Sequence, residues 1–301
     1  MDTENCFYDR MAKCMAAKIH CENGAVDVAM SLVSVVITIP SVVSLILVSP
    51  FSIVTICSIA VGMLILQLCF LVYHYLKWRK YSTIYYGVSP LTLFFKKNFS
   101  KDKQDPLNEN VNKLAKQAEL ELHYRQVPVS FAMAFWEMFL YAPETISIIA
   151  SGSNIPIMGL FSSSLGSFIV NVVSGIYYLY RWNSLANRST NKSFFKRLSE
   201  IFLKKSPPTE PLTDEQIKTE ALIKKSIAIV RKDNASGRFF FHLAQALLYL
   251  PSGIAIFFTS VSAFTLAIFV AFGVFLLAIA LVVYHGYLWY SGGKEAEQIN
   301  I

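Results

Sequence analysis

Three long uncharged stretches dominate the pattern of hydrophobic and polar positions along this 301-residue chain. No Asp, Glu, Lys or Arg lies between residues 28 and 76 or between 239 and 293, and only Glu137 and Glu144 interrupt the stretch from 128 to 180. A helix needs about 20 apolar residues to cross a membrane, so each stretch accommodates two crossings and a tight turn. The pattern predicts an all-α polytopic membrane protein with six transmembrane helices in three hairpins.

The same pattern predicts the organisation of the chain. Turns inside the hairpins are expected where small residues and helix breakers gather, at residues 48–51, 151–156 and 259–262. The predicted segments are an N-terminal helix at 1–27, membrane hairpins at 28–78, 128–182 and 239–290, connectors with short amphipathic helices at 79–127 and 183–238, and a tail at 291–301.

The connector helices carry their own signals. Thr213 with Gln216 three residues later has the spacing of a capping box, which marks a helix start. In the first connector apolar residues recur every three or four positions, which predicts a face that packs on the hairpins, lies in the lipid interface or docks a protein partner. The apolar positions are Leu107, Val111, Leu114, Ala118 and Leu122, and the opposite face carries Lys113, Lys116 and Glu119.

The three hairpins also read as copies of one unit. Aligned on a final tryptophan, their second helices match without a gap over residues 51–78, 155–182 and 262–289. Each first helix has one proline with a polar residue six positions before it, and the prolines recur at intervals of 103 and 108 residues. Two independent anchors with nearly one period predict a triplicated repeat. The equivalent residues are Trp78, Trp182 and Trp289; Pro40, Pro143 and Pro251; and Ser34, Glu137 and Gln245.

The charge distribution predicts the topology. The net charge is +7, and all 27 Lys and Arg lie outside the uncharged stretches. Because basic residues favour the cytosolic side, both termini and both connectors are expected there. Lys77, Arg79, Lys80 and Arg181 lie beside helix ends, where anionic lipid headgroups would attract them. No nucleic-acid-binding signature accompanies this charge, so a nucleic-acid partner is not expected.

Polar residues within the apolar stretches are the candidate functional positions. A carboxylate such as Glu137 is costly in lipid and often marks an ion or proton route, but Ser34 and Gln245 at the equivalent positions favour hydrogen bonds between helices. Glu144 follows Pro143 and is expected to satisfy the carbonyl that the proline frees. Further candidates are Gln67 and Asn171, which coincide in the alignment and are expected to bond between helices.

Aromatic, histidine and cysteine residues add less specific signals. Trp78, Trp182 and Trp289 are predicted interfacial anchors, and the tips of His74, His242 and His285 are expected to reach the headgroups. Five cysteines imply no disulfide framework. Cys6, Cys14 and Cys21 lack the spacing of a zinc site and are expected to be free thiols, with palmitoylation as an open alternative. No catalytic or phosphate-binding motif is present, so neither enzymatic activity nor a cofactor or metal is expected.

Two known families share parts of this organisation. Mitochondrial carriers also have three two-helix repeats, but their P-x-[DE]-x-x-[KR] motif is missing here, where SVVS, ETIS and SGIA follow the prolines. The paired apolar lobes, tight turns and common side for both termini resemble the bilobed domain of chlamydial inclusion membrane proteins. That resemblance implies a secreted bacterial protein anchored in a host vacuole membrane, with its remainder exposed to the host.

Two functions follow as hypotheses. The favoured one is a non-enzymatic membrane scaffold, in contact with the bilayer and with anionic headgroups, whose basic cytosolic helices recruit a protein partner or organise the membrane. The alternative is a transporter or channel for a small solute or ion, built as a pseudo-threefold bundle of six helices. Few ionisable groups and no paired half-helices favour the scaffold.

Overall fold

The computed structural model describes residues 2–48, 54–95, 111–123, 213–255 and 265–299, together with a few positions between 129 and 183. All regular structure within these residues is helical, as the sequence predicts. The labelled helices are α1 (Asp2–Val48), α2 (Val54–Tyr86), α3 (Pro90–Phe95), α7 (Asp214–Ala255) and α8 (Thr265–Gln298). Residues 111–123, here the connector helix, are helical as well.

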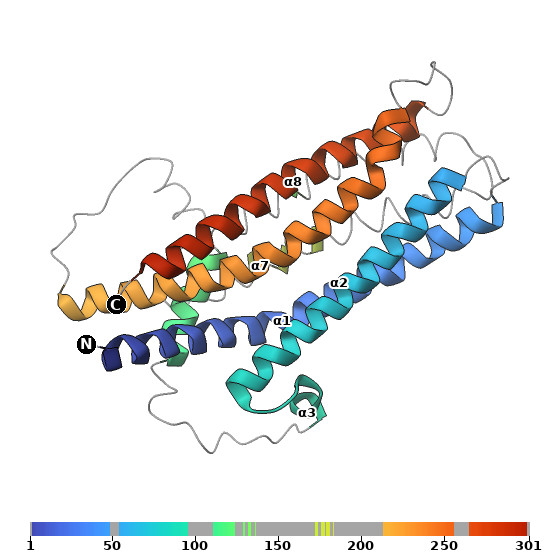
Figure 1. Cartoon of the computed structure of the whole chain (residues 1–301). Coiled ribbons are helices and arrows are strands. Elements are labelled where there is room, and N and C mark those ends of the chain that lie inside the picture. Colours follow the sequence, from blue (N-terminus) through green and yellow to red (C-terminus); the bar gives the residue numbers. More distant parts are fainter. Residues whose placement is uncertain are drawn as a thin grey trace.

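The long helices form two antiparallel pairs, α1 with α2 and α7 with α8 (Figure 1). The gap between α1 and α2 lies at 49–53 and the gap between α7 and α8 at 256–264. Both gaps contain or overlap a predicted hairpin turn, whereas the predicted turn at 151–156 lies outside the described residues. The two chain termini lie at the same end of the molecule (Figure 1), which is called the charged end below.

The helices run through several of the predicted segment boundaries. α1 continues across residue 27 without a break, and α7 continues across residue 238. Pro40 and Pro251 lie inside these helices rather than at their ends. Each charged segment is therefore joined to its apolar segment by continuous helix, because no residue between them interrupts the backbone hydrogen bonds.

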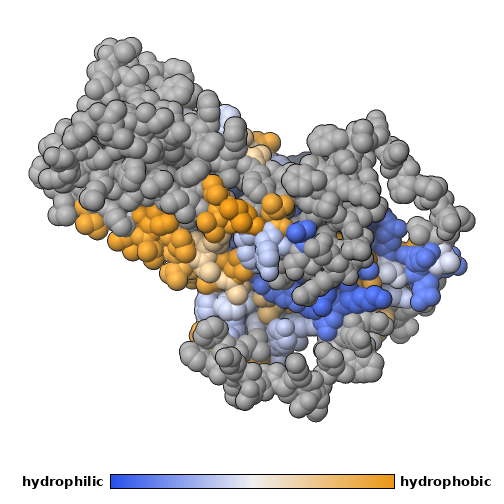
Figure 2. All heavy atoms as spheres, turned by 180° about the vertical axis from the view of Figure 1, so that it is seen from behind, coloured by the Kyte–Doolittle hydropathy of each residue, from blue (hydrophilic) through white to orange (hydrophobic). Residues whose placement is uncertain are grey.

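Within the part of the chain that the structure describes, three helical stretches are long and apolar enough to cross a membrane: Cys6–Ile39, Val61–Tyr86 and Gly273–Gln298. Their outward faces carry aliphatic side chains such as Val36, which is 57% exposed, and Val283, which is 67% exposed. Figure 2 shows apolar side chains gathered on one part of the described surface and polar ones on another. Exposed apolar faces on helices of this length are typical of surfaces that contact a membrane or a protein partner.

A tightly packed core lies at the charged end, where the first part of α1, the connector helix and the first part of α7 meet. Met15, Ala118 and Ser226 are fully buried there, and Ile19 is 1% exposed. The predicted apolar face of the connector helix is thus turned into a helical core. Glu119 was expected on its polar face but is 1% exposed.

The start of α7 has the predicted cap. The Thr213 backbone N–H donates to Gln216 Oε1 at 2.9 Å, and the Gln216 N–H donates to Thr213 Oγ1 at 3.4 Å. This reciprocal arrangement satisfies two backbone donors that a helix start leaves without partners. The capping box predicted from the sequence is confirmed.

Candidate functional site between α1, α2 and α7

A set of polar side chains joins three helices just inside the charged end. We call it the polar cluster and define it as His20 of α1, Lys77 and Tyr81 of α2, and Asp233 and Asn234 of α7. These residues approach one another because α7 packs against both helices of the α1–α2 pair. The contacts connect chain segments more than 150 residues apart.

Asp233 is the centre of the polar cluster. Its carboxylate accepts a hydrogen bond from the Tyr81 hydroxyl, and its Oδ2 lies 3.5 Å from His20 Nε2. The His20 and Tyr81 rings stack with centroids 4.2 Å apart and planes 22° apart. One carboxylate on α7 is thus held by a ring pair from α1 and α2.

The electrostatics of Asp233 follow from these contacts. Burial by itself would raise the pKa of the carboxyl, but the adjacent His20 ring, the hydrogen bond from Tyr81 and the charge of Lys77 lower it below the ordinary value of 3.8. Donors that bind the ionised form favour that form over the protonated one. Asp233 is therefore a fixed negative charge that ties the helices together, rather than a group prepared to exchange a proton near neutral pH.

Two glycines allow the helices to approach at this level. A Cβ at Gly237 of α7 would lie 2.5 Å from the Tyr73 ring, and one at Gly24 of α1 would lie 2.4 Å from the Trp78 ring. The Tyr73 hydroxyl donates to the Asp233 carbonyl oxygen at 3.3 Å, and Trp78 Nε1 donates to the Cys21 carbonyl oxygen at 3.1 Å. The aromatic rings at the end of α2 thus fill space that only glycine leaves open.

A second polar contact fixes the connector helix. Asn112 Oδ1 accepts hydrogen bonds from Lys18 Nζ of α1 and from the Tyr85 hydroxyl of α2, the latter at 2.6 Å. Lys18 also lies 3.7 Å from Glu22. The connector helix is therefore held by hydrogen bonds as well as by the apolar core.

A small cavity lies beside the core, between α1, the connector helix and α7. Its volume is about 20 Å³, room for about one water molecule. Its lining is polar, and its residues are Asn23, Val26, Asp27, Leu122, His123, Tyr177, Asn234 and Arg238. This space could hold a bridging water but no larger solute.

The histidines predicted to reach the headgroups turn inward instead. His74 Nδ1 lies 3.8 Å from the Asp27 carboxylate, with an 11% exposed side chain. The His285 ring stacks on His242 with centroids 5.3 Å apart, and His242 Nδ1 lies 3.1 Å from Gln245 Oε1. These rings contribute to packing within the helix pairs because neighbouring side chains offer them contacts that lipid cannot.

The predicted intramembrane positions do not converge within the described part of the chain. Gln245 contacts His242 of its own helix, and the Ser34 carbonyl oxygen accepts a hydrogen bond from Thr38 Oγ1 at 2.9 Å. The Gln67 side-chain oxygen is buried without a hydrogen-bond partner. Outside the described residues lie Glu137, Glu144, Asn171, Pro143 and Trp182. Of the remaining anchors, Trp289 packs against Phe239 and Phe240, each with centroids 5.7 Å apart.

The thiols differ in accessibility. Cys6 is exposed, Cys14 half-buried and Cys21 buried, all as free cysteines. Among the described residues no group of three or more His, Cys, Asp or Glu is placed to hold a metal ion. Cys6 is thus the most accessible of the three N-terminal thiols.

The sequence alone drew attention to Lys77 but not to the other members of the polar cluster, which are His20, Tyr81, Asp233 and Asn234. Lys77 was expected at the headgroups, yet its Nζ donates to Asn234 Oδ1 across the interface between α2 and α7. One signal was available: Asn234 stands at the position of the predicted repeat that Asn23 occupies in the first unit. An asparagine at the same position of the first and third units suggests that this side chain faces the inside of the bundle and contacts another helix.

Comparison of the chain with protein-family models, with curated proteins and with solved structures found no match. The function is therefore argued from the geometry of this chain.

Proposed function

We propose that this chain is a non-enzymatic, multi-pass membrane scaffold that holds a basic helical bundle at the cytosolic face of a membrane for a protein partner. In this proposal three hairpins cross the membrane six times, and both termini lie in the cytosol. The charged end is then the cytosolic part, and the exposed aliphatic faces of α1, α2 and α8 contact lipid. The resemblance to inclusion membrane proteins makes a host vacuole the first membrane to examine.

The buried core supports a triplicated arrangement. Met15, Ala118 and Ser226 are each 0% exposed, and they are separated by 103 and 108 residues, the same intervals that separate the three prolines. The next turn repeats the relation with Ile19, Leu122 and Val230, which are 1%, 4% and 1% exposed. Equivalent positions in one core are expected if three copies of a unit surround a common pseudo-threefold axis.

The closed core is the observation that carries the scaffold function. Three helical segments meet there with side chains that water does not reach, and the cavity beside them holds about 20 Å³. A solute path along the same axis would need polar lining and a wider opening at this point. A closed, rigid core instead suits a scaffold protein, in which the outer surface of the bundle carries the function.

That outer surface is basic and is rigidly connected to the apolar part of the molecule. Lys113 and Lys116 lie exposed on the connector helix, while α1 and α7 pass unbroken from the core into the apolar stretches. The bundle therefore cannot swing freely relative to the membrane-facing part, because a continuous helix transmits its orientation. A partner with an acidic surface would be held at a fixed height and angle.

Recruitment is tested with the full chain purified from its own cells in mild detergent. The variant Lys113→Glu/Lys116→Glu is expected to lose a specific co-purifying protein. The matched variant Lys13→Glu/Lys224→Glu makes the same charge change at residues that are 66% and 58% exposed, and it is expected to retain that protein. Equal loss from both variants would show non-specific charge attraction and contradict recruitment by the connector helix.

Transport is tested with the same protein in proteoliposomes. The scaffold proposal expects no saturable uptake of solutes or ions above that of empty vesicles. Saturable uptake that Glu137→Gln abolishes would reject the scaffold in favour of a transporter with a carboxylate in its path.

A further inference from the structure

One face of α2 carries a continuous line of exposed aliphatic side chains. The residues recur every three or four positions, which places them on one side of the helix. They are Ile65, Leu68, Val72 and Leu76, exposed by 56%, 43%, 55% and 54%, and we call them the α2 stripe. At a rise of 1.5 Å per residue the stripe is about 16 Å long. That is about half of a 30 Å hydrocarbon core, the depth of one leaflet.

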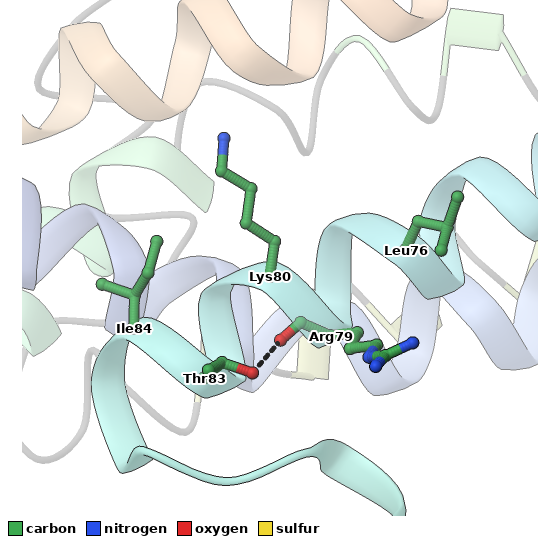
Figure 3. Close-up of a pocket in the computed structure, with 5 residues that line it drawn as sticks. All are labelled: Leu76, Arg79, Lys80, Thr83 and Ile84. Carbon is green, nitrogen blue, oxygen red and sulfur yellow. Dashed lines mark hydrogen bonds between the residues drawn. The ribbon is translucent and has the colours of Figure 1, made fainter.

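The stripe ends in a groove that contains two cations. Leu76, Arg79, Lys80, Thr83 and Ile84 line an open groove of about 530 Å³. In Figure 3, Leu76, Lys80 and Ile84 point to the same side of α2 and Arg79 lies on its flank. The Thr83 hydroxyl donates to the Arg79 carbonyl oxygen at 2.9 Å. Apolar and basic side chains thus share one surface at the charged end of the stripe.

The two cations are free to bind an anion. Arg79 and Lys80 are exposed, and among the described residues neither has an ion-pair partner. Lys80 Nζ lies 5.3 Å from the centroid of the Tyr81 ring, which the polar cluster holds in place. Lys77, one turn earlier, is already engaged with Asn234. A charge-assisted bond to phosphate is the chemistry that Arg79 and Lys80 leave open.

α8 provides an internal comparison. The proposed repeat places Leu276, Ile279, Val283 and Tyr287 at the positions of the α2 stripe, and these are 48%, 41%, 67% and 67% exposed. The positions of Arg79 and Lys80 are occupied by Tyr290 and Ser291, which carry no charge. An exposed apolar face is therefore common to both helices, whereas the basic pair belongs to α2 alone.

We propose that the groove on α2 binds one anionic phospholipid from the leaflet at the charged end. Its phosphate lies between Arg79 and Lys80, and an acyl chain follows the α2 stripe toward Ile65. The inference rests on the proposed function in one respect, that α2 crosses the membrane with its basic end at the surface. It adds a specific lipid site, on one helix, to that general arrangement.

The test uses the full chain in detergent micelles, with retained lipids counted by native mass spectrometry. The probes are long-chain phosphatidylglycerol and phosphatidylcholine, added in competition. Wild-type protein is expected to retain one phosphatidylglycerol with about 30-fold preference, about five-fold for each basic side chain near the headgroup. Arg79→Gln/Lys80→Gln is expected to bind both lipids alike. Lys113→Gln/Lys116→Gln, which removes the same charge from the connector helix, is expected to keep the preference.

Two further experiments separate the contribution of the lipid headgroup from that of the acyl chain. Leu76→Ser is expected to weaken the binding of both long-chain lipids several-fold without changing the preference between them. Glycerol phosphate at millimolar concentration is expected not to displace the bound phosphatidylglycerol, because it lacks the acyl chain that follows the stripe.

The proposal is overturned if Arg79→Gln/Lys80→Gln retains the preference, if both charge variants lose it equally, or if glycerol phosphate displaces the lipid. Melting curves of each variant in the same detergent show whether a loss of lipid binding reflects unfolding. The single variants Arg79→Lys and Lys80→Arg keep the charge and are expected to retain the preference for phosphatidylglycerol. These outcomes are distinct from failure of the scaffold, which shows itself as saturable uptake in proteoliposomes.

Discussion

The hydrogen bond between Tyr81 and Asp233 gives the sharpest test of how the helices are held together. Tyr81→Phe removes the hydroxyl that donates to the Asp233 carboxylate and leaves the ring stacked on His20. Asp233→Asn keeps the shape of the acceptor but removes its charge. Because the amide oxygen can still accept from the Tyr81 hydroxyl, a double-mutant cycle measures the part of the interaction that depends on the charge of Asp233.

The magnitude follows from the surroundings of Asp233. A hydrogen bond to a charged group contributes about 1.5–3 kcal/mol to stability. The Asp233 side chain is 32% exposed, so water screens part of this interaction and the lower half of the range applies. Tyr81→Phe is expected to lower the free energy of unfolding by about 1.5–2 kcal/mol, and the coupling with Asp233→Asn is expected to be about 1 kcal/mol.

Equilibrium unfolding in mixed micelles, with helical circular dichroism followed as denaturing detergent increases, measures these values. The matched control is Tyr287→Phe, because Tyr287 is 67% exposed on α8 and a surface change of this kind alters stability by less than about 0.5 kcal/mol. A coupling energy below about 0.5 kcal/mol would refute the reasoning, since the polar cluster would then contribute no more than a surface contact.

Three further predictions concern the same part of the molecule. The pKa of Asp233 is lowered below 3.8 in the folded state, so the stability that its charge contributes is present above pH 3.8 and is lost as the pH falls through the lower folded pKa. The free energy of unfolding of Asp233→Asn is therefore expected to depend less on pH than that of wild type between pH 6 and about pH 2.5. Parallel plots of unfolding free energy against pH for the two proteins would contradict this. Ile19→Ala empties a site that is 1% exposed and is expected to cost about 2–5 kcal/mol, measured by the same unfolding assay; a loss below about 1 kcal/mol would mean that the core is loosely packed. Gly237→Ala places a Cβ 2.5 Å from the Tyr73 ring and is expected to cost about 1–3 kcal/mol; the double change with Tyr73→Ala is expected to cost less than the sum, and full additivity would show that the ring is not the obstacle.

The helical organisation was predictable because it depends on short-range patterns. Apolar stretches of two crossing lengths indicated the α1–α2 and α7–α8 pairs, and helix breakers indicated the gaps between them. The capping box at Thr213 and the apolar face of the connector helix need only neighbours three or four residues away. Such features are encoded within a few turns of one helix.

The sequence by itself thus determined that the chain is helical, where its apolar and basic segments lie and which residues the proposed repeat makes equivalent. Only the tertiary structure decided which polar groups meet. Tyr81 and Asp233 are 152 residues apart, and their contact depends on the rotation of α2 and α7 about their axes. The same rotation directs Lys77 toward Asn234 and leaves Arg79 outside, and the way the connector helix packs on the bundle buries Glu119. Hydropathy does not specify it, because a lysine that faces lipid headgroups and a lysine that bonds to the next helix stand at the same place in a linear pattern.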